Sequence, residues 1–87
     1  MWNLRVTKRA EKSLGELDHQ HKLKIVRYLD ELIKLKDPHT KGKALTGQLS
    51  GLWRFRVTDY RIICQIDGEI ITVLVLDIGH RRDIYNE

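Results

Sequence analysis

Arginine residues recur in this sequence at a spacing suited to phosphate binding. In the stretch WRFRVTDYRI, residues 53–62, they occupy positions 54, 56 and 61, with aromatic residues between them. A guanidinium group is planar, stays cationic and can donate two parallel hydrogen bonds to a phosphate. An aromatic side chain at the rim of such a site can stack on an unpaired base. The pattern therefore indicates a site for a polymer that carries phosphate.

Metal-free cleavage of RNA is a chemistry that such a site can perform. It requires removal of the 2′-hydroxyl proton, stabilisation of the charged transition state and protonation of the leaving 5′-oxygen. Arg54, Arg56 and Arg61 suit the second task, because arginine is cationic and can be positioned in advance. Arginine is a poor base, since its pKa is about 12.5 or higher. Histidine is the natural acid or base at neutral pH, and His80 is the histidine expected beside this cluster.

The positions of these residues depend on three predicted strands. An alternating apolar pattern predicts strands over residues 52–57, 60–66 and 69–78, joined by turns at Thr58-Asp59 and Asp67-Gly68. If both turns have two-residue loops, Arg56 lies opposite Arg61, and Arg61 lies opposite Leu74. One sheet face then forms the core: Trp53, Phe55, Val57, Tyr60, Ile62, Cys64, Ile71, Val73 and Val75. The other face is open: Arg54, Arg56, Arg61, Ile63, Gln65, Thr72, Leu74 and Leu76.

Two like charges directly opposite each other destabilise a sheet, so Arg56 and Arg61 call for an anion. The alternative is a solvated face, with arginine stems lying on the sheet and heads in water. The sequence GHRRDIY, residues 79–85, favours the anion site, because it delivers His80, Arg81, Arg82 and Tyr85 where the last strand ends.

Two helices are expected before these strands, after a short strand over residues 3–6. Apolar residues at helical spacing predict one helix over 8–17 and a longer one over 21–36. Asp18 is the expected N-cap of the longer helix, and Asp37-Pro38 is its expected end. The two helices would form an αα-hairpin that packs on the core face of the sheet.

Composition narrows the class of protein. The chain has 87 residues, which suit one domain over 1–87, and 41% of them are hydrophobic. This mixture excludes a disordered chain, and no apolar run predicts a membrane span or a signal peptide. Cys64 is the single cysteine, as expected in a reducing, cytoplasmic environment. The net charge of +4 favours nucleic acid or an acidic protein as partner.

Other candidate sites are weaker. His19 and His21 have no further ligands nearby to hold a metal, so we expect neither a metal site nor a cofactor. The segment GKALTGQ, residues 42–48, lacks the Lys-Ser/Thr ending of a phosphate loop. Cys64 is expected to pack in the core, where a nucleophilic role is disfavoured.

Residues 43–85, KALTGQLSGLWRFRVTDYRIICQIDGEIITVLVLDIGHRRDIY, resemble the RelE branch of the RelE/ParE superfamily of bacterial toxins. The resemblance lies in K-x-L-x-G, R-x-R, Y-R-I and the terminal H-R-x-x-x-Y. It implies an α+β fold of order β-α-α-β-β-β, with an antiparallel sheet covered on one face by an αα-hairpin. It also implies a toxin of a type II toxin–antitoxin system, which binds the ribosome and cuts messenger RNA in the A site. A cognate RelB-like antitoxin would block it, and operator DNA would be bound only through the toxin–antitoxin complex.

The family's functional positions fall on residues of this chain. By resemblance, Arg54, Arg56, Arg61, Arg81 and Tyr85 bind and polarise the scissile phosphate, support proton transfer and stack a base. Lys43 and Arg82 are expected to add phosphate contacts. The best-known member has lysines in place of Arg54 and Arg56, which moves the search for an acid or base to His80 or Tyr85.

Two further functions are compatible with the same fold. One is a DNA gyrase inhibitor of the ParE branch, which would not need RNA-cutting residues. The other is a catalytically inert module that binds antitoxin and serves as co-repressor. Ile63, Leu74 and Leu76, an apolar strip beside the arginines, are the expected antitoxin contacts under every reading.

Overall fold

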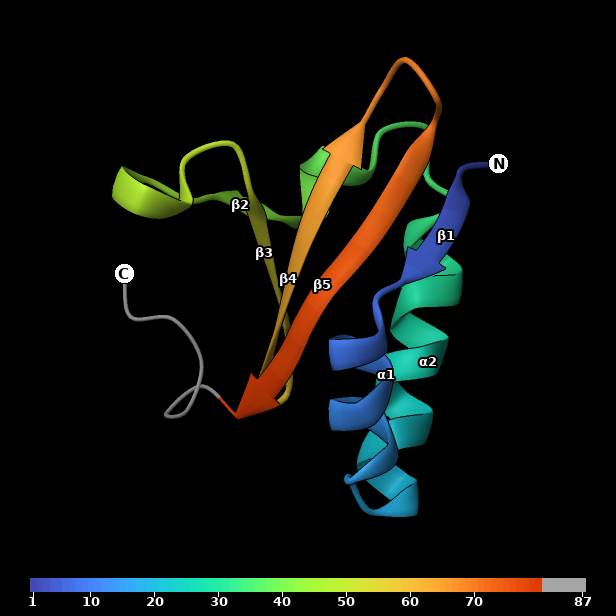
Figure 1. The fold of residues 1–87 in the computed structure, drawn as a ribbon. Helices are drawn as coiled ribbons and strands as arrows, with labels where there is room; N and C mark the ends of the chain where they lie inside the picture. Colours follow the sequence, from blue (N-terminus) through green and yellow to red (C-terminus); the bar gives the residue numbers. More distant parts are fainter. Residues whose placement is uncertain (81–87) are drawn as a thin grey trace.

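The computed structural model describes residues 1–80, which form two helices against one face of a five-stranded sheet (Figure 1). Two short 3₁₀ helices, η1 and η2, precede and follow β2. The elements in chain order are β1 (Asn3–Val6), α1 (Lys8–Gly15), α2 (His19–Leu32), η1 (Pro38–Lys41), β2 (Lys43–Ala44), η2 (Gly47–Leu49), β3 (Trp53–Val57), β4 (Tyr60–Asp67) and β5 (Thr72–His80). This architecture confirms the expected α+β class.

The sheet is mixed, so the prediction of an antiparallel sheet was wrong at one edge. The strand order is β1-β5-β4-β3-β2, and β1 pairs with β5 in the parallel sense, with Leu4 opposite Val73. The other three pairings are antiparallel. The parallel pair is possible because the chain between its strands includes both helices, which provide the long crossover that parallel strands need.

Side-chain caps set where the helices begin. Thr7 Oγ1 accepts a hydrogen bond from Ala10 N at the start of α1. Asp18 caps α2, as predicted, by accepting from His21 N at 3.0 Å. The helix ends at Leu32, short of the predicted residue 36. Pro38 instead begins η1, with Asp37 as its cap, because proline fits the first turn of a helix better than its end.

The hairpin between β4 and β5 differs from the predicted two-residue turn. Asp67 pairs with Thr72, and the Asp67 carboxylate accepts a hydrogen bond from Glu69 N across the loop. The longer loop and a bulge at Ile63/Cys64 together shift the register, so that Arg61 lies opposite Gly79 and not opposite Leu74. Ile71, expected in the core, is instead exposed in this loop. A bulge at Ile63/Cys64 leaves Leu76 without a direct partner on β4.

The main core lies between the helices and the sheet. Its fully buried members come from α1, α2 and the three long strands, and include Ala10, Ile25, Phe55, Ile62, Cys64, Val73 and Val75. Trp53 packs against this cluster as a partly buried residue. Among residues 1–80, no helix is both long and apolar enough to cross a membrane.

A second, smaller core covers part of the opposite sheet face, which was predicted to be open. Leu45 and Ile63 are buried there against Leu49, Leu52 and Leu76. Ile63 is only 1% exposed, so it does not form the exposed apolar strip expected beside the arginines. Leu74 and Leu76 are half-buried. The segment between β2 and β3 therefore folds over this face and packs its leucines against Ile63 and Leu76.

Candidate nucleic-acid interface

Lysine and arginine side chains from β2, β3 and β4 lie on the sheet face opposite the helices. Arg56 pairs with Arg61 across β3 and β4, as predicted, and Arg54 pairs with Lys43 across β3 and β2. Phe55, Val57 and Ile62 alternate with them and are buried in the main core, so the cationic side chains point the other way. We call Lys43, Arg54, Arg56 and Arg61 the arginine face.

The electrostatics of this face favour an anion. Arg56 and Lys43 are exposed, whereas Arg54 and Arg61 are half-buried. Two guanidinium groups on directly opposite residues repel each other, and a phosphate between them removes that cost. Asp77 lies opposite Ile63 in the neighbouring row, but its carboxylate is paired with Arg9 Nη2 of α1 at 3.2 Å. The negative charge of Asp77 is thus paired with a cation from the helical layer, Arg9.

Gly79 is a part of this site that sequence reasoning did not identify. It lies directly opposite Arg61 on β5, where any other residue would place a side chain beside the guanidinium. A glycine inside a strand often marks a close approach by a ligand or another backbone. The signal was present in the sequence as the glycine of DIGH, but its position depends on the observed register.

His80 does not join the arginine face. It pairs with Tyr60, and the two rings lie 5.7 Å apart between centroids. Tyr60 packs against the main core and also contacts His21 of α2, with ring centroids 5.1 Å apart. His80 therefore lies on the helix side of the sheet, because neighbouring strand residues face opposite ways and Gly79 takes the position beside Arg61.

Three predicted site residues, Arg81, Arg82 and Tyr85, lie outside the described residues. Within residues 1–80, no three His, Cys, Asp or Glu side chains are grouped so that they could hold a metal ion. His21, which the sequence offered as a weak candidate metal ligand, contacts the Asp18 carboxylate through Nδ1 at 3.0 Å.

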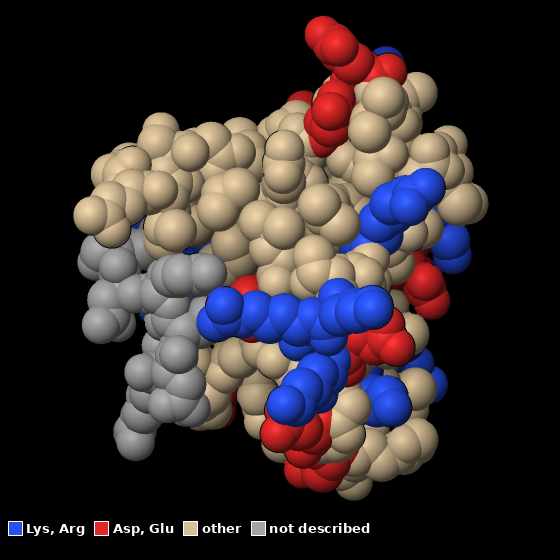
Figure 2. Space-filling model, viewed as in Figure 1, with Lys and Arg blue, Asp and Glu red and all other residues tan. Residues whose placement is uncertain are grey.

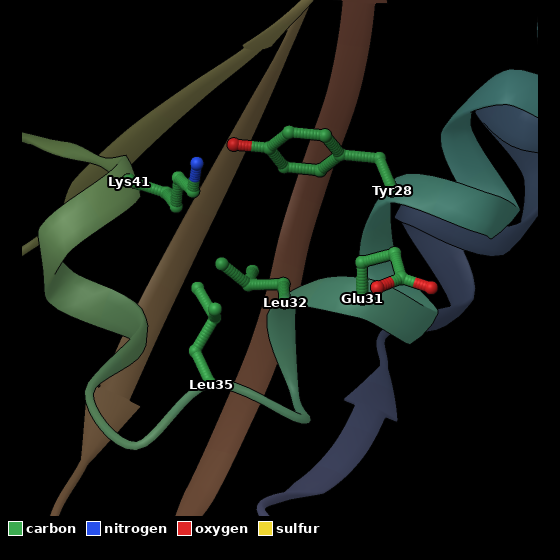
Figure 3. A pocket seen from close by; sticks show the side chains of 5 residues that line it. All are labelled: Tyr28, Glu31, Leu32, Leu35 and Lys41. Carbon is green, nitrogen blue, oxygen red and sulfur yellow. The ribbon is translucent and has the colours of Figure 1, made fainter.

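A pocket of about 290 Å³ lies between α2 and η1. Figure 3 shows the Tyr28 hydroxyl directed toward the Lys41 ammonium group, with Leu32 and Leu35 beneath and Glu31 turned away. Burial raises the pKa of the Tyr28 phenol, and the nearby Cys64 adds to this effect. With one lysine, one glutamate and an apolar floor, this pocket matches phosphate less well than the arginine face does.

The helix side carries mixed charge. In Figure 2, Lys and Arg side chains over the helices are interspersed with Asp and Glu. Examples are Lys8, Glu11 and Lys12, which border one shallow hollow on α1. The net positive charge of the chain therefore does not by itself point to one face, whereas strand alternation gathers Lys43, Arg54, Arg56 and Arg61 on one side of the sheet.

Comparisons with known proteins agree with this fold. Residues 4–85 match the family model described as "ParE toxin of type II toxin-antitoxin system, parDE". Over 50 residues the chain is 40% identical to the toxin RelG of Mycobacterium tuberculosis. That match covers 58% of this chain and 58% of the relative's length.

Solved structures extend the likeness to nearly the whole chain. A chain of the toxin–antitoxin complex RelBE2 from Mycobacterium tuberculosis is 30% identical, with a TM-score of 0.83. The alignment covers 92% of this chain and 98% of that one. A chain of the archaeal RelE–RelB complex from Pyrococcus horikoshii is 25% identical, with a TM-score of 0.73. There the alignment covers 92% of this chain and 94% of the other.

Proposed function

We propose that this chain cuts messenger RNA in the ribosomal A site, because it belongs to the ParE toxin family of type II toxin–antitoxin systems. In this reaction the 2′-hydroxyl of one nucleotide attacks the adjacent phosphorus, and the bond to the 5′-oxygen breaks. The products are a 2′,3′-cyclic phosphate and a free 5′-hydroxyl. The proposal places the enzyme in the cytoplasm, with the ribosome and its message as partners.

The observation that carries the proposal is the pair of arginines facing each other beside a glycine. Arg56 and Arg61 are directly opposite, and the residue opposite Arg61 on β5 is Gly79, which has no side chain of its own. A phosphate bound there would gain negative charge during the attack, and preorganised guanidinium groups stabilise such charge. In this proposal Arg61 and Arg56 stabilise the transition state, while Arg54 and Lys43 hold neighbouring phosphates.

Proton transfer needs other groups, because arginine rarely gives up its proton. His80 and Tyr85 were the candidates from the sequence. The contact of the His80 ring with Tyr60 argues against His80 as a direct acid or base at a phosphate on Arg61. We therefore assign proton transfer to Tyr85, the other candidate, which follows His80 in the sequence.

We further propose that a RelB-like antitoxin neutralises this toxin and that operator DNA is bound only through their complex. Structures similar to this chain include toxin–antitoxin complexes from Mycobacterium tuberculosis and Pyrococcus horikoshii, which supports such a partner. An acidic, partly disordered antitoxin would complement the net charge of +4.

A cleavage assay on a programmed bacterial ribosome tests the enzymatic proposal. Primer extension on the message should reveal a discrete A-site cut with the wild type, and Arg61→Ala should abolish it. Arg27→Ala is the matched control, because Arg27 is an exposed arginine on α2 and outside the arginine face. Arg61→Ala should retain antitoxin binding; equal loss of cleavage and antitoxin binding would count against a catalytic role.

A gyrase inhibitor is the second candidate, favoured by the ParE description of the matching family model. A supercoiling assay with purified gyrase separates the two functions. Inhibition of supercoiling without any cut in the message would support the gyrase reading. Absence of both activities in folded, antitoxin-free protein would support the inert co-repressor.

A further inference from the structure

The pocket between α2 and η1 combines two hydrogen-bond donors with an apolar floor. Its volume is about 290 Å³, and it is lined by Tyr28, Glu31, Leu32, Leu35 and Lys41. We call it the α2–η1 pocket. In Figure 3 the Tyr28 hydroxyl and the Lys41 ammonium group point toward one another, and Leu32 and Leu35 lie beneath them. A concave site with an apolar lining and a few convergent polar groups is typical of a site for a small molecule.

Both donors are attached to fixed parts of the fold. The Tyr28 ring packs against the main core and contacts Phe55 edge to face, with centroids 6.3 Å apart. Lys41 is the last residue of η1, and the next residue, Gly42, lies directly on the same phenylalanine. A Cβ at Gly42 would come within 2.8 Å of two carbons of the Phe55 ring. Phe55 therefore contacts both the Tyr28 ring and the end of η1, which fixes where the two donors lie.

The charge inside the pocket is positive. Glu31, the acid in its lining, is turned away from the other side chains in Figure 3, and its carboxylate lies 3.9 Å from Lys34 Nζ. The ion pairs among residues 1–80 do not include Lys41. Burial raises the pKa of Tyr28, so its phenol stays protonated at neutral pH and can donate a hydrogen bond. One cation and one neutral donor are thus available to an anion.

These donors suit a carboxylate better than a phosphate. A carboxylate has two oxygens, and each can accept one hydrogen bond from the pair. A phosphate presents more oxygens and more charge than one lysine and one phenol can satisfy. The apolar floor of Leu32 and Leu35 favours an apolar group on the ligand. Since a cavity of about 150 Å³ accommodates benzene, the volume suits a ligand of roughly ten non-hydrogen atoms.

We propose that the α2–η1 pocket binds a carboxylate that carries a short branched apolar group. The carboxylate lies between the Tyr28 hydroxyl and the Lys41 ammonium group, and the apolar group lies on Leu32 and Leu35. A free organic acid and the C-terminal residue of a peptide share this chemistry, and the experiment below distinguishes them.

The α2–η1 pocket is separate from the arginine face. Leu32 belongs to the main core on the helix side of the sheet, whereas Arg56 and Arg61 point to the opposite side. The two sites have no residue in common. Carboxylate binding is therefore a second property of the chain, and it does not rest on the proposed cleavage of RNA.

An NMR titration of the full chain tests the proposal with two probes. 4-Methylpentanoate represents a free acid, and N-acetyl-leucine represents the C-terminal residue of a peptide. Each should shift the methyl signals of Leu32 and Leu35 and the amide signal of Lys41, with a Kd of about 1 mM for ligands of this size. The probe that binds more tightly identifies the source of the carboxylate. Neutral 4-methylpentanamide should bind about tenfold more weakly, and acetate should give no saturable shift.

Two variants each remove one donor. Lys41→Gln removes the charge of an exposed side chain and should weaken binding of both acids about tenfold, while binding of the amide stays the same. Tyr28→Phe keeps the ring on Phe55, removes the hydroxyl and should also weaken binding of the acids about tenfold. Lys36→Gln is the matched control, because Lys36 is an exposed lysine outside the pocket, and it should bind like the wild type.

Three outcomes would overturn the proposal. Equal binding of the acid and the amide would show that the carboxylate is not recognised. Equal losses in Lys41→Gln and Lys36→Gln would indicate attraction by net charge alone. Inorganic phosphate that shifts the Lys41 signal as strongly as the acids would show that the apolar floor has no role. None of these readouts involves RNA, so either this proposal or the endonuclease proposal can fail without the other.

Discussion

Arg56 and Arg61 lie directly opposite each other, which suits phosphate binding but brings two like charges together. The Cα atoms of directly opposite residues on neighbouring strands lie within about 5.5 Å of each other, so the like charges of Arg56 and Arg61 repel each other across the strand pair. The chain tolerates the arrangement at the position where phosphate binding is proposed. Local destabilisation of this kind is expected at functional sites.

We predict that Arg56→Thr stabilises the protein by about 0.5 kcal/mol and reduces ribosome-dependent cleavage. Arg56 is exposed on β3, where threonine is a good strand former. Urea unfolding measures the first effect and primer extension the second. A destabilised variant would show that the pair is not repulsive.

Burial controls the chemistry of Cys64. The thiol is fully buried in the main core, and desolvation raises its pKa from 9.0 to about 12. At pH 8 this lowers the thiolate fraction about a thousandfold. We predict that iodoacetamide modifies Cys64 about a thousandfold more slowly in the native protein than in the urea-unfolded protein, as followed by mass spectrometry.

The same shift has a consequence for stability at alkaline pH. The folded-state pKa is raised, so Cys64 has no effect below its unfolded pKa and costs stability as pH rises from about 9 toward 12. Cys64→Ala should remove that part of the pH dependence. A wild-type protein whose Cys64 reacts rapidly at pH 8 would contradict both expectations.

Among the elements, the connection between β1 and α1 depends on Thr7. Its hydroxyl accepts from Ala10 N at 3.1 Å and donates to Leu76 O at 3.0 Å. One side chain thus caps α1 and ties it to β5 at the residue that bulges from the β4–β5 ladder. The first bond is local, whereas the second joins residues 69 positions apart in the chain, which makes Thr7 a joint between the helical layer and the sheet.

Thr7→Val preserves the shape of the side chain and removes both hydrogen bonds. We predict a loss of about 1–2 kcal/mol in the free energy of unfolding, measured by urea titration. Thr7→Ser keeps the hydroxyl and should lose much less. Equal losses in the two variants would mean that methyl packing, and not the cap, stabilises the joint.

Considered as a whole, the molecule separates a mixed-charge helical side from a cationic sheet face. The arginine face gathers four of the 16 Lys and Arg residues on three neighbouring strands. Binding of RNA to such a face releases counterions, so affinity should fall steeply with salt. This dependence is a property of the charge distribution over the whole sheet.

We predict that Lys43→Gln weakens binding to single-stranded RNA and lowers the slope of log K against log salt by about 0.7. Filter binding at several salt concentrations measures the slope. Lys24→Gln, an exposed lysine of α2, should leave it unchanged. An equal effect of both variants would indicate binding governed by net charge alone.

The amino-acid sequence by itself determined the features that depend on local chemistry. Hydrophobic periods predicted α1, β1, β3 and most of α2 and β4, and the two-residue turn at Thr58-Asp59 placed Arg56 opposite Arg61. These features follow from neighbours a few residues apart, where turn geometry and side-chain period leave little choice. The grouping of Arg54, Arg56 and Arg61 on one face was therefore predictable, whereas no strand was predicted at residues 43–44, where β2 places Lys43 opposite Arg54.

Only the tertiary structure decided the features that depend on distant segments. The longer loop between Asp67 and Thr72 and the bulge at Ile63/Cys64 set the β5 register, which put Gly79 beside Arg61 and His80 beneath the helices. The parallel edge at β1 likewise required knowledge of long-range pairing. A shift of one residue turns each following side chain to the other face of a sheet. For that reason the register of β5 separates His80 from the arginines.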